Sequence, residues 1–425
     1  MSVLEQTAPE GYKQTEVGII PDDWDCLSLQ DLCTQITDGT HHTPKYVDSG
    51  IPFYSVENIT KNNFTDTKYI TEQEHKSLIK RCKPEHGDII MSRITAGILG
   101  DTKLIDWDVD ASIYVSLALL KFKGNYSAEY IYNYTKSNQF LNDISQSGLT
   151  YATPKKINLN AIGSVYLPIP KELEEQKTIA SALSDVDALL TELEKLIAKK
   201  QAIKTATMQQ LLTGKTRLPQ FATYTDSEKQ GQLKGTKPSE LGEIPEDWDV
   251  VKFSEVCLSF KTGKLDANAM RNDGEYRFYT CARNHYYIDH YAFDTEALLV
   301  SGNGANVGYV HYFKGKFNAY QRTYVLSDFC ADVKYLKIYL EEKLAERIRV
   351  EVNSGNTPYI TMYTLTDMLV ILPPSEEQTA IATILSDMDN EIQTLEQRLA
   401  KTRQIKQSMM QELLTGRTRL PFDKD

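Results

Sequence analysis

The stretch EEQKTIASALSDVDALLTELEKLIAKKQAIKTATMQQLLTGKTRLP, which spans Glu174–Pro219, returns at Glu376–Pro421 as EEQTAIATILSDMDNEIQTLEQRLAKTRQIKQSMMQELLTGRTRLP. The two copies align without a gap at a constant offset of 202 residues. A repeat of this length governs the architecture, because each copy is expected to form the same structural element.

Each copy is predicted to be one long helix. Apolar residues recur at alternating steps of four and three, which is the a/d spacing of helices that wrap around each other. Gly214 and Gly416 stand where a helix ends, and Ser375 with Gln378 predicts a capping box at the start of the second helix. The apolar positions are Ile179, Leu183, Val186, Leu190, Leu193 and Ile197 in the first copy and Ile381, Leu385, Met388, Ile392, Leu395 and Leu399 in the second.

Two matching apolar stripes favour pairing of the helices with each other over burial of each stripe in a separate globular domain. If the helices run antiparallel, the segment between them lies at one end of the pair and the segment before the first helix lies at the other. A duplication related by a two-fold axis gives this arrangement. A parallel pair would crowd both segments together at one end. We therefore predict an antiparallel coiled coil.

Length and composition restrict the class of protein. At 425 residues the chain is expected to form two to three domains. No apolar run is long enough to span a bilayer, and the first residues lack the pattern of a signal peptide. The six cysteines include no CxxC pair, so they are predicted to be reduced thiols in a cytoplasmic protein without membrane contact.

The net charge of −11 argues against a generic nucleic-acid binder. The surplus is uneven, however, because residues 1–50 hold nine acids and two bases, whereas residues 51–170 hold twelve acids and thirteen bases. One face of an acidic protein can remain basic, so charge alone does not decide the partner.

The repeat extends upstream of the helices. The opening signature GIIPDDWDCLSLQDLC, at Gly18–Cys33, matches GEIPEDWDVVKFSEVC at Gly242–Cys257. The segments that follow differ in sequence, yet both contain short strand-like runs with helical patches between them, and Ser147-Gly148 and Ser354-Gly355 predict a turn near the end of each. The fold class is therefore α+β, with two homologous mixed domains, two long antiparallel helices and an internal pseudo-two-fold repeat. The predicted order is an N-terminal arm (1–20), a first domain (21–170), a first long helix (171–218), a linker (219–241), a second domain (242–374), and a second long helix with a tail (375–425).

This combination resembles the specificity subunit of type I restriction-modification enzymes. The resemblance covers nearly the whole chain, and the duplicated IP-x-DW, EEQ and LLTG-[KR]-TRLP motifs carry it, together with DGTHHTP and SGIPFYSVENI in the first domain. It implies that the two domains are target-recognition domains, each of which reads one half of a split, asymmetric sequence in double-stranded DNA. It also implies that the helices set the spacer and dock two methyltransferase subunits, and that motor-nuclease subunits join for cleavage.

The chain is predicted to be non-catalytic and to need no cofactor. It contains no Asn-Pro-Pro-aromatic tetrapeptide, no Phe-x-Gly-x-Gly loop and no Walker motif. The glycine-rich stretch SGNGANVGYV, at Ser301–Val310, continues into another strand-like run, so we predict a hairpin turn there and not a nucleotide loop. The pairs His41-His42 and His285/His290 lack further ligands at metal spacing, which predicts no metal site.

DNA contacts are expected from polar loops of the two variable domains. Arg reads guanine and Asn or Gln reads adenine through paired hydrogen bonds, whereas Lys, Ser and Thr more often hold phosphate. Each of these residues could instead be an ordinary solvated residue or turn former, Asn303 and Asn306 in particular. In the first domain the candidates are Thr40, His41, His42, Thr43, Lys45, Tyr46, Ser92, Arg93, Tyr151, Thr153, Lys155 and Lys156. In the second domain they are Lys261, Lys264, Asn268, Arg283, Asn284, His285, Asn303, Asn306, Gln321, Arg322 and Tyr359.

A second apolar line runs beside the seam of the first helix through Leu189, Leu196 and Ile203. Either a docked methyltransferase subunit or the chain's own domains could cover it. Two classes of function remain: a DNA-reading scaffold, and a non-catalytic coiled-coil adaptor whose two domains bind proteins or ligands.

Overall fold

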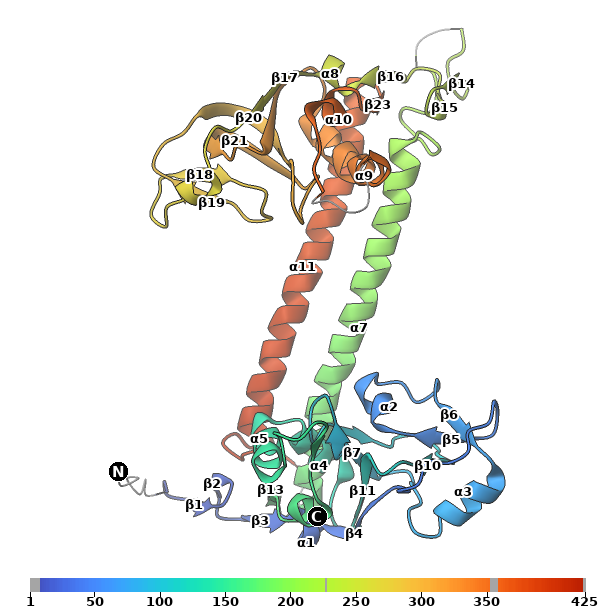
Figure 1. Ribbon diagram of the computed structural model, residues 1–425, viewed down its shortest axis with the longest axis vertical. Helices are drawn as coiled ribbons and strands as arrows, with labels where there is room; N and C mark the ends of the chain where they lie inside the picture. Colours follow the sequence, from blue (N-terminus) through green and yellow to red (C-terminus); the bar gives the residue numbers. More distant parts are fainter. Residues whose placement is uncertain (1–7, 226–227, 352–357, 423–425) are drawn as a thin grey trace. The chain divides into compact units, whose positions relative to one another are not determined.

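The computed structural model describes residues 8–225, 228–351 and 358–422. The chain forms two compact units (Figure 1). Unit 1 consists of Met1–Glu194 together with Gln397–Asp425, and unit 2 consists of Lys195–Glu396. Unit 1 is thus assembled from the two ends of the chain. The turn predicted at Ser354-Gly355 lies outside the described residues.

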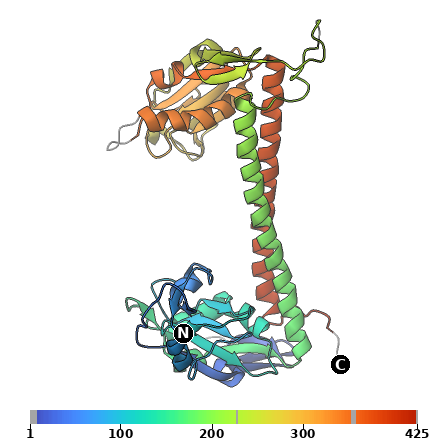
Figure 2. The same ribbon diagram turned by 90° about the vertical axis from the view of Figure 1, so that its right-hand side faces the viewer.

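Both repeats of the opening stretch are single long helices, α7 (Leu173–Leu212) and α11 (Ser375–Leu413). In each unit, half of α7 lies beside half of α11 (Figure 2). In unit 1, Asp187 pairs with Lys406 at 2.5 Å and Glu194 pairs with Arg403 at 2.6 Å. The partner number falls as the number on α7 rises, so the helices run antiparallel.

Unit 2 shows the same sense of pairing. Lys200 pairs with Glu391 at 2.7 Å and Lys204 pairs with Asp389 at 2.5 Å. All twelve residues of the predicted a/d seam are buried or half-buried. The predicted antiparallel pairing and α+β class are confirmed, because the ion pairs fix the sense of the helices and both units combine helices with strands.

Unit 1 is built on a four-stranded antiparallel sheet with the order β4-β11-β7-β9. Its strands are β4 (Cys33–Asp38), β7 (Ile89–Ser92), β9 (Thr102–Leu104) and β11 (Leu117–Phe122). The central strands are apolar on both faces because two hydrophobic clusters cover them, one containing Ile89 and one containing Ile90. The other strands are β1 (Tyr12–Thr15), β2 (Gly18–Pro21), β3 (Trp24–Ser28), β5 (Ile51–Tyr54), β6 (Lys68–Ile70), β8 (Ile94–Thr95), β10 (Ser112–Ile113), β12 (Lys155–Lys156) and β13 (Tyr166–Pro170). The shorter helices are α1 (Leu29–Leu32), α2 (Val56–Thr60), α3 (Glu72–Leu78), α4 (Ala128–Thr135), α5 (Asn138–Ser147) and α6 (Leu159–Gly163).

Unit 2 is built on a six-stranded sheet with the order β17-β22-β20-β21-β18-β19. Its strands are β17 (Cys257–Thr262), β18 (Tyr276–Tyr279), β19 (Tyr286–Ile288), β20 (Phe293–Ser301), β21 (Val310–Ala319) and β22 (Thr323–Phe329). The remaining elements are β14 (Thr236–Ser239), β15 (Gly242–Pro245), β16 (Asp249–Lys252), β23 (Leu369–Leu372), α8 (Phe253–Val256), η1 (Ala267–Ala269), α9 (Val333–Glu351) and α10 (Met362–Thr366). The hairpins β14–β15 and β1–β2 occupy matching sequence positions, so the repeat begins before the opening signature.

In unit 2 the three short repeated motifs meet around one arginine. Arg217 of LLTGKTRLP donates to Asp247 of the IPEDW signature at 2.7 and 3.1 Å and to Glu377 of EEQ at 3.1 Å. Trp248 Nε1 donates to Glu377 at 2.9 Å, and the Arg217 guanidinium carbon lies 5.8 Å from the Trp248 ring centre. Burial works against the charge of Arg217, but its bonds to Glu377 and Asp247 outweigh burial and raise its pKa. We call this set the unit 2 hub.

Unit 1 repeats the hub with residues from both ends of the chain. Arg419 donates to Asp23 at 3.0 and 3.1 Å and to Glu175 at 2.7 Å, and its guanidinium carbon lies 5.7 Å from the Trp24 ring centre. Each hub therefore takes its IP-x-DW and EEQ motifs from one repeat and its TRLP motif from the other. The repeated motifs therefore join the helix ends to the domains through hydrogen bonds and ion pairs.

The glycine before each TRLP motif is required by backbone geometry. Gly214 and Gly416 have φ of +69° and +70°, in the left-handed region that ends helices. A Cβ at Gly214 would lie 2.3 Å from Pro245 Cδ, and one at Gly416 would lie 2.5 Å from Pro21 Cγ. The proline of the opening signature thus packs directly on the helix end.

The predicted capping box of the second helix is wrong. Among the described residues, no hydrogen bond joins the Gln378 side chain to Ser375; its Oε1 accepts from the Asp332 amide at 2.9 Å, and its Nε2 donates to the Pro373 carbonyl at 2.7 Å. Gln176 makes the corresponding two bonds in unit 1. The EEQ glutamine is buried against its own domain, which outcompetes a local cap.

The six cysteines are free thiols. Burial raises the pKa of Cys33, Cys82 and Cys257 to about 12. In the part of the chain that the structure describes, no helix is long and apolar enough to cross a membrane.

Candidate nucleic-acid interface

In unit 1 the Asp38 carboxylate organises the DGTHH loop, because it contacts three basic side chains. Asp38 is 5% exposed and lies 3.0 Å from Arg81 Nη2, 2.5 Å from Arg93 Nη1 and 3.0 Å from His41 Nε2. Gly39 is required beside it, because a Cβ there would lie 2.0 Å from the Ile113 carbonyl oxygen. The tight crossing holds Asp38 at the end of β4, from where it orients both arginines.

The surface of this loop presents imidazole rings. His41 and His42 have exposed side chains (68% and 65%). Thr40 is buried, and its Oγ1 lies 2.8 Å from His42 Nδ1, so it positions the ring. Thr43 is exposed, and its Oγ1 lies 3.4 Å from the Tyr114 hydroxyl.

A second edge is formed by the loop that carries Tyr151. Strand β12 pairs with β8, and Lys155 Nζ donates to the Gly97 carbonyl at 3.2 Å. The side chains of Tyr151 and Lys156 are exposed, and Tyr151 is fully so. Thr153 is exposed in the same loop. Arg93 joins this edge to the DGTHH loop, since it bonds Asp38 with Nη1 and the Ile157 carbonyl with Nε.

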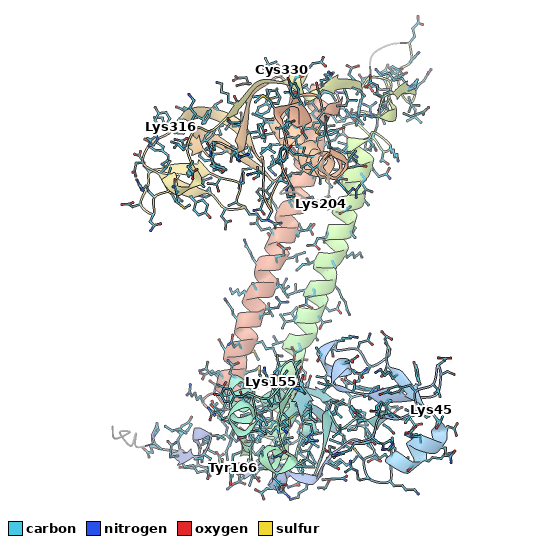
Figure 3. All side chains as sticks on the ribbon, in the orientation of Figure 1. Lys45, Lys155, Tyr166, Lys204, Lys316 and Cys330 are labelled. Carbon is cyan, nitrogen blue, oxygen red and sulfur yellow. The ribbon has the colours of Figure 1, made fainter. Side chains whose placement is uncertain are left out.

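Lys45 and Tyr46 continue the DGTHH loop, because Tyr46 packs on Phe53 beside Tyr114, whose hydroxyl lies 3.4 Å from Thr43 Oγ1. Figure 3 shows Lys45 well away from Lys155. The Tyr46 ring packs 6.0 Å from Phe53, with Lys68 Nζ 4.6 Å from its centre. The DGTHH loop and its continuation to Tyr46 therefore extend away from Lys155.

Two predicted contact residues are committed inside unit 1. Ser92 is 1% exposed, and its hydroxyl donates to the Ile98 carbonyl and accepts from the Asp101 amide. The side chain of Arg93 is 11% exposed, and its Nε and Nη1 donate to the Ile157 carbonyl, the Asp38 carboxylate and the Val115 carbonyl. Burial and internal bonds therefore make Ser92 part of the interior, whereas a DNA contact by Arg93 stays a prediction.

In unit 2 the predicted residues gather at one edge of the six-stranded sheet. The amide of Gln321 donates to the Leu265 carbonyl at 2.9 Å, which brings the loop after β17 against the turn before β22. Asn306 Nδ2 donates to the Cys281 carbonyl at 3.0 Å, which ties the β20–β21 hairpin to the loop after β18. The predicted residues with exposed side chains are Lys261, Lys264, Asn268, Arg283, Asn284, Gln321, Arg322 and Tyr359.

Three predicted residues of unit 2 are half-buried. Asn306 fixes the hairpin, as its bond to Cys281 shows, and Asn303 forms a backbone bridge with Tyr359. Burial lowers the pKa of His285, with Arg277 adding to the effect. Burial also lowers the pKa of His311, which lies 2.9 Å from the Ala282 carbonyl oxygen. Burial therefore disfavours the protonated form of both rings.

The glycine-rich stretch at Ser301–Val310 is a hairpin, as predicted. Strands β20 and β21 pair antiparallel up to Val300 and Val310. Gly304 and Gly308 have φ of +80° and +81°, which L residues with a side chain rarely adopt. The glycines therefore serve the turn, and the segment lacks the following helix of a nucleotide loop.

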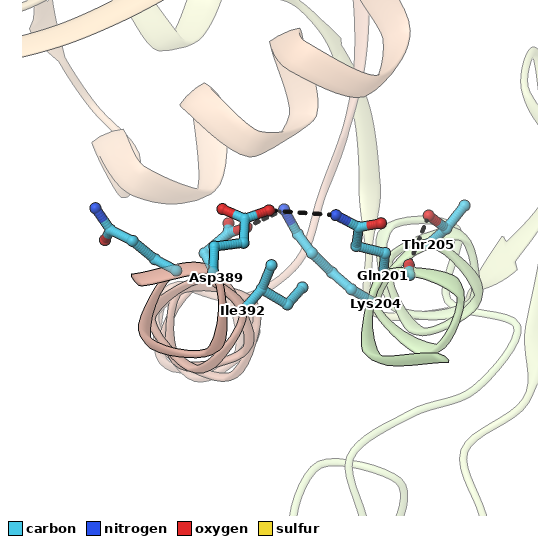
Figure 4. Close-up of a pocket in the computed structure, with 7 residues that line it drawn as sticks. Gln201, Lys204, Thr205, Asp389 and Ile392 are labelled. Atoms are coloured by element: carbon cyan, nitrogen blue, oxygen red, sulfur yellow. Dashed lines mark hydrogen bonds and ion pairs between the residues drawn. The ribbon is translucent and has the colours of Figure 1, made fainter. Parts of the chain in front are cut away.

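Between the paired helices, unit 2 contains a polar groove (Figure 4). Lys204 reaches across to Asp389, and Gln201 Nε2 donates to Glu396 at 3.4 Å. Outside the seam, the proposed partner-binding residues of α7 are exposed. Leu189 is 40% exposed in unit 1, and Leu196 and Ile203 are 38% and 41% exposed in unit 2.

Three residues that shape the interface were not among those predicted from the sequence. Arg81 has a 56% exposed side chain and bonds Asp38, which lies 43 residues earlier in the chain. Asp38 itself is adjacent to the predicted loop, and an acid next to Gly-Thr-His-His was the available signal. Arg277 lies with its guanidinium carbon 4.6 Å from the Phe313 ring centre.

Comparisons with known proteins show the family and the fold of the chain. The model of the family described as "Type I restriction modification DNA specificity domain" matches residues 21–205 and 245–404. The type I restriction enzyme EcoDI specificity subunit of Escherichia coli is 38% identical over 174 residues, which cover 41% of this chain and 38% of that protein. The putative type I restriction enzyme MjaX specificity subunit of Methanocaldococcus jannaschii is 26% identical over 441 residues, which cover 97% of each. The crystal structure of a type I restriction-modification system S subunit from M. genitalium has the same fold, with a TM-score of 0.59 at 14% identity, over 92% of this chain and 96% of that one.

Proposed function

Because this chain belongs to the family of type I restriction-modification DNA specificity domains, we propose that each of its two variable domains reads one half of a split, asymmetric DNA target. Unit 1 supplies the first recognition domain and unit 2 the second. The paired helices set the unread spacer, and the exposed line on α7 docks methyltransferase subunits.

One observation carries the proposal: two equivalent backbone frames present different polar side chains. Gly39 and Gly263 make the same tight crossing, because a Cβ at Gly263 would lie 1.8 Å from the Ala319 carbonyl oxygen. The residues displayed beyond that crossing are His41 and His42 in unit 1 and Lys264 in unit 2. A shared frame with different donors and acceptors is what reading two different half-sites requires, since base edges are distinguished by their hydrogen-bond pattern.

The exposed residues fall into two chemical types, one suited to base edges and one suited to phosphate. Side chains with two adjacent hydrogen-bonding groups can pair with purine edges, and here these are Arg283, Asn284, Gln321 and Arg322. Lysines suit phosphate, and here these are Lys156, Lys261 and Lys264. The acidic net charge of the chain fits a reader that approaches DNA with two limited surfaces and relies on its partner subunits for further contacts.

We expect the purified chain alone to transfer no methyl group and to cut no DNA. The physical reason is that its sequence carries no cofactor or nucleotide loop. Incorporation of label from S-adenosylmethionine into target DNA measures the first activity, and agarose electrophoresis measures the second. The control is the same chain mixed with methyltransferase subunits. Methylation by the chain without them would contradict the assignment.

Exchange of one domain should change one half of the target. Replacement of residues 27–170 by the equivalent segment of another family member should alter the first half-site completely and leave the half read by residues 251–374 unchanged. The hub of each unit keeps its own motifs in such a chimera, so both units are expected to fold. Sequencing of methylated bases measures the motif. A simultaneous change in both halves would show that the domains do not read independently.

The coiled-coil adaptor remains the rival function, and salt dependence separates the two. A DNA reader in complex with its methyltransferase subunits should bind its target duplex with an affinity that falls steeply as salt rises, because phosphate contacts release counterions. An adaptor whose domains bind proteins would show no affinity of this kind.

A further inference from the structure

Arg93 of unit 1 and Gly302 of unit 2 occupy equivalent backbone positions in the two domains. The Arg93 amide donates to the Ser116 carbonyl at 2.9 Å, and the Arg93 carbonyl accepts from the Ile157 amide at 2.9 Å. Both residues directly follow a central strand of the main sheet, β7 in unit 1 and β20 in unit 2.

Gly302 makes the same two backbone bonds in unit 2. Its amide donates to the Arg322 carbonyl at 2.8 Å, and its carbonyl accepts from the Ile360 amide at 2.9 Å. A Cβ at Gly302 would lie 2.4 Å from the Arg322 carbonyl oxygen, so the two backbones approach too closely for any side chain. The equivalence extends to Ser92 and Ser301, which precede them and are both buried.

In unit 1 a side chain fills this place. The Arg93 guanidinium bonds the Asp38 carboxylate at 2.5 Å, the Val115 carbonyl at 3.2 Å and the Ile157 carbonyl at 3.3 Å. The ion pair closes the space between β4, the turn before β11 and the strand β12. The ion pair itself is buried, since the Arg93 side chain is 11% and the Asp38 side chain 5% exposed.

In unit 2 the same place is open. Thr262 stands where Asp38 stands, directly before the crossing glycine, and Gln321 stands where Val115 stands, so both the guanidinium and its carboxylate are missing. A cavity of about 270 Å³ results. Its lining consists of Thr262, Gly302, Gln321, Arg322, Tyr324, Tyr359 and Ile360.

The lining offers paired hydrogen-bond donors and acceptors at the rim. Gln321 and Arg322 are exposed, and within the described residues neither side chain makes a hydrogen bond. The Tyr324 hydroxyl already donates a hydrogen bond to the Ile360 carbonyl at 2.9 Å. Tyr359, in contrast, is 59% exposed. A glutamine fork matches the N6 and N7 edge of adenine, and an arginine fork matches the O6 and N7 edge of guanine. No lysine, the usual phosphate ligand, belongs to the lining.

We propose that this cavity is a base-reading subsite of the second domain, which takes the major-groove edge of a purine in the second half-site. The proposal rests on the proposed function. It places one base of the target in the cavity of the second domain. At the equivalent position of the first domain, the Asp38–Arg93 ion pair fills the space, so the first domain cannot bind a base there.

The test uses the full chain in complex with its methyltransferase subunits and a duplex whose motif is taken from the bases that the complex methylates. Dissociation constants are measured at one salt concentration for this duplex and for duplexes with each base pair of the second half-site replaced in turn. Gln321→Ala or Arg322→Ala should reduce discrimination at one purine position by about 5- to 150-fold. Discrimination across the first half-site should stay the same.

A second variant fills the cavity from another wall. Thr262→Phe leaves both forks in place and should weaken discrimination at the same position, provided that its circular dichroism spectrum matches that of the parent chain. Lys261→Ala, one residue earlier on β17, is the comparator for a phosphate contact. It should weaken binding to every duplex equally and lower the salt slope by about one.

Each outcome decides. If Gln321→Ala and Arg322→Ala both behave as Lys261→Ala is expected to, the cavity holds phosphate and the proposal is overturned. If both keep full discrimination at every position while the parent complex prefers its target, the subsite is overturned and the proposed function stands. A parent complex without preference for any split target would overturn both.

Discussion

Arg217→Ala should lower the free energy of unfolding of unit 2 by about 3–5 kcal/mol, the range for breaking a buried ion pair by removing one partner. The side chain of Glu377 is 1% exposed and that of Arg217 is 9% exposed. Without the guanidinium, the Trp248 indole is, among the described residues, the one side chain left that donates a hydrogen bond to the Glu377 carboxylate. The end of α7 would also lose its bonds to the opening signature.

Hydrogen exchange followed by mass spectrometry measures this loss, because amides of β16 and β23 report on unit 2 while those of β3 and β13 in unit 1 serve as an internal reference. Lys237→Ala is the matched control, since it removes an ion pair of unit 2 whose partners are 41% and 74% exposed and should cost less than about 1 kcal/mol. The double variant Arg217→Met with Glu377→Gln should recover part of the loss, because no charge stays buried. If Arg217→Ala lowers the free energy of unfolding as little as Lys237→Ala does, the unit 2 hub does not stabilise the unit.

Lengthening both long helices should lengthen the unread spacer of the DNA target. Four residues inserted after Glu194 and four after Glu396 fall where the chain passes between the two units. They extend a helix by about 6 Å at 1.5 Å per residue, which corresponds to about two base pairs at roughly 3.4 Å each. The methylation motif should keep both half-sites and gain about two unspecified base pairs.

Rotation favours this insertion over a heptad. Four residues turn a helix by roughly 40° beyond a full turn, and two base pairs turn DNA by about 70° in the same sense. Seven residues would turn the face by about 20° the other way while asking for roughly three base pairs. The measurement is the motif methylated by the complex, with a single-helix insertion as the control, which should mispair the seam and abolish activity. An active variant that methylates at the original spacing would show that another element measures the distance.

The sequence by itself determined the repeat, the two long helices, their antiparallel seam and the hairpin at Ser301–Val310. These features depend on periodicity and on turn residues, which are local properties of the chain. It also predicted DNA contacts in the DGTHH loop and at Gln321 and Arg322, and these stay predictions. It did not reveal that Ser92 and most of the Arg93 side chain are buried, because burial depends on segments far away in the sequence.

Only the tertiary structure decided how the motifs are used. Arg419 meets Asp23 across 396 positions of sequence, and Arg93 meets Asp38 across 55, so neither partner is visible in a local window. Whether a polar side chain reads a ligand or locks the fold depends on its burial and on the groups that reach it. Segments far apart in sequence supply both, which is why Arg93 fills a space in unit 1 that Gly302 leaves open in unit 2.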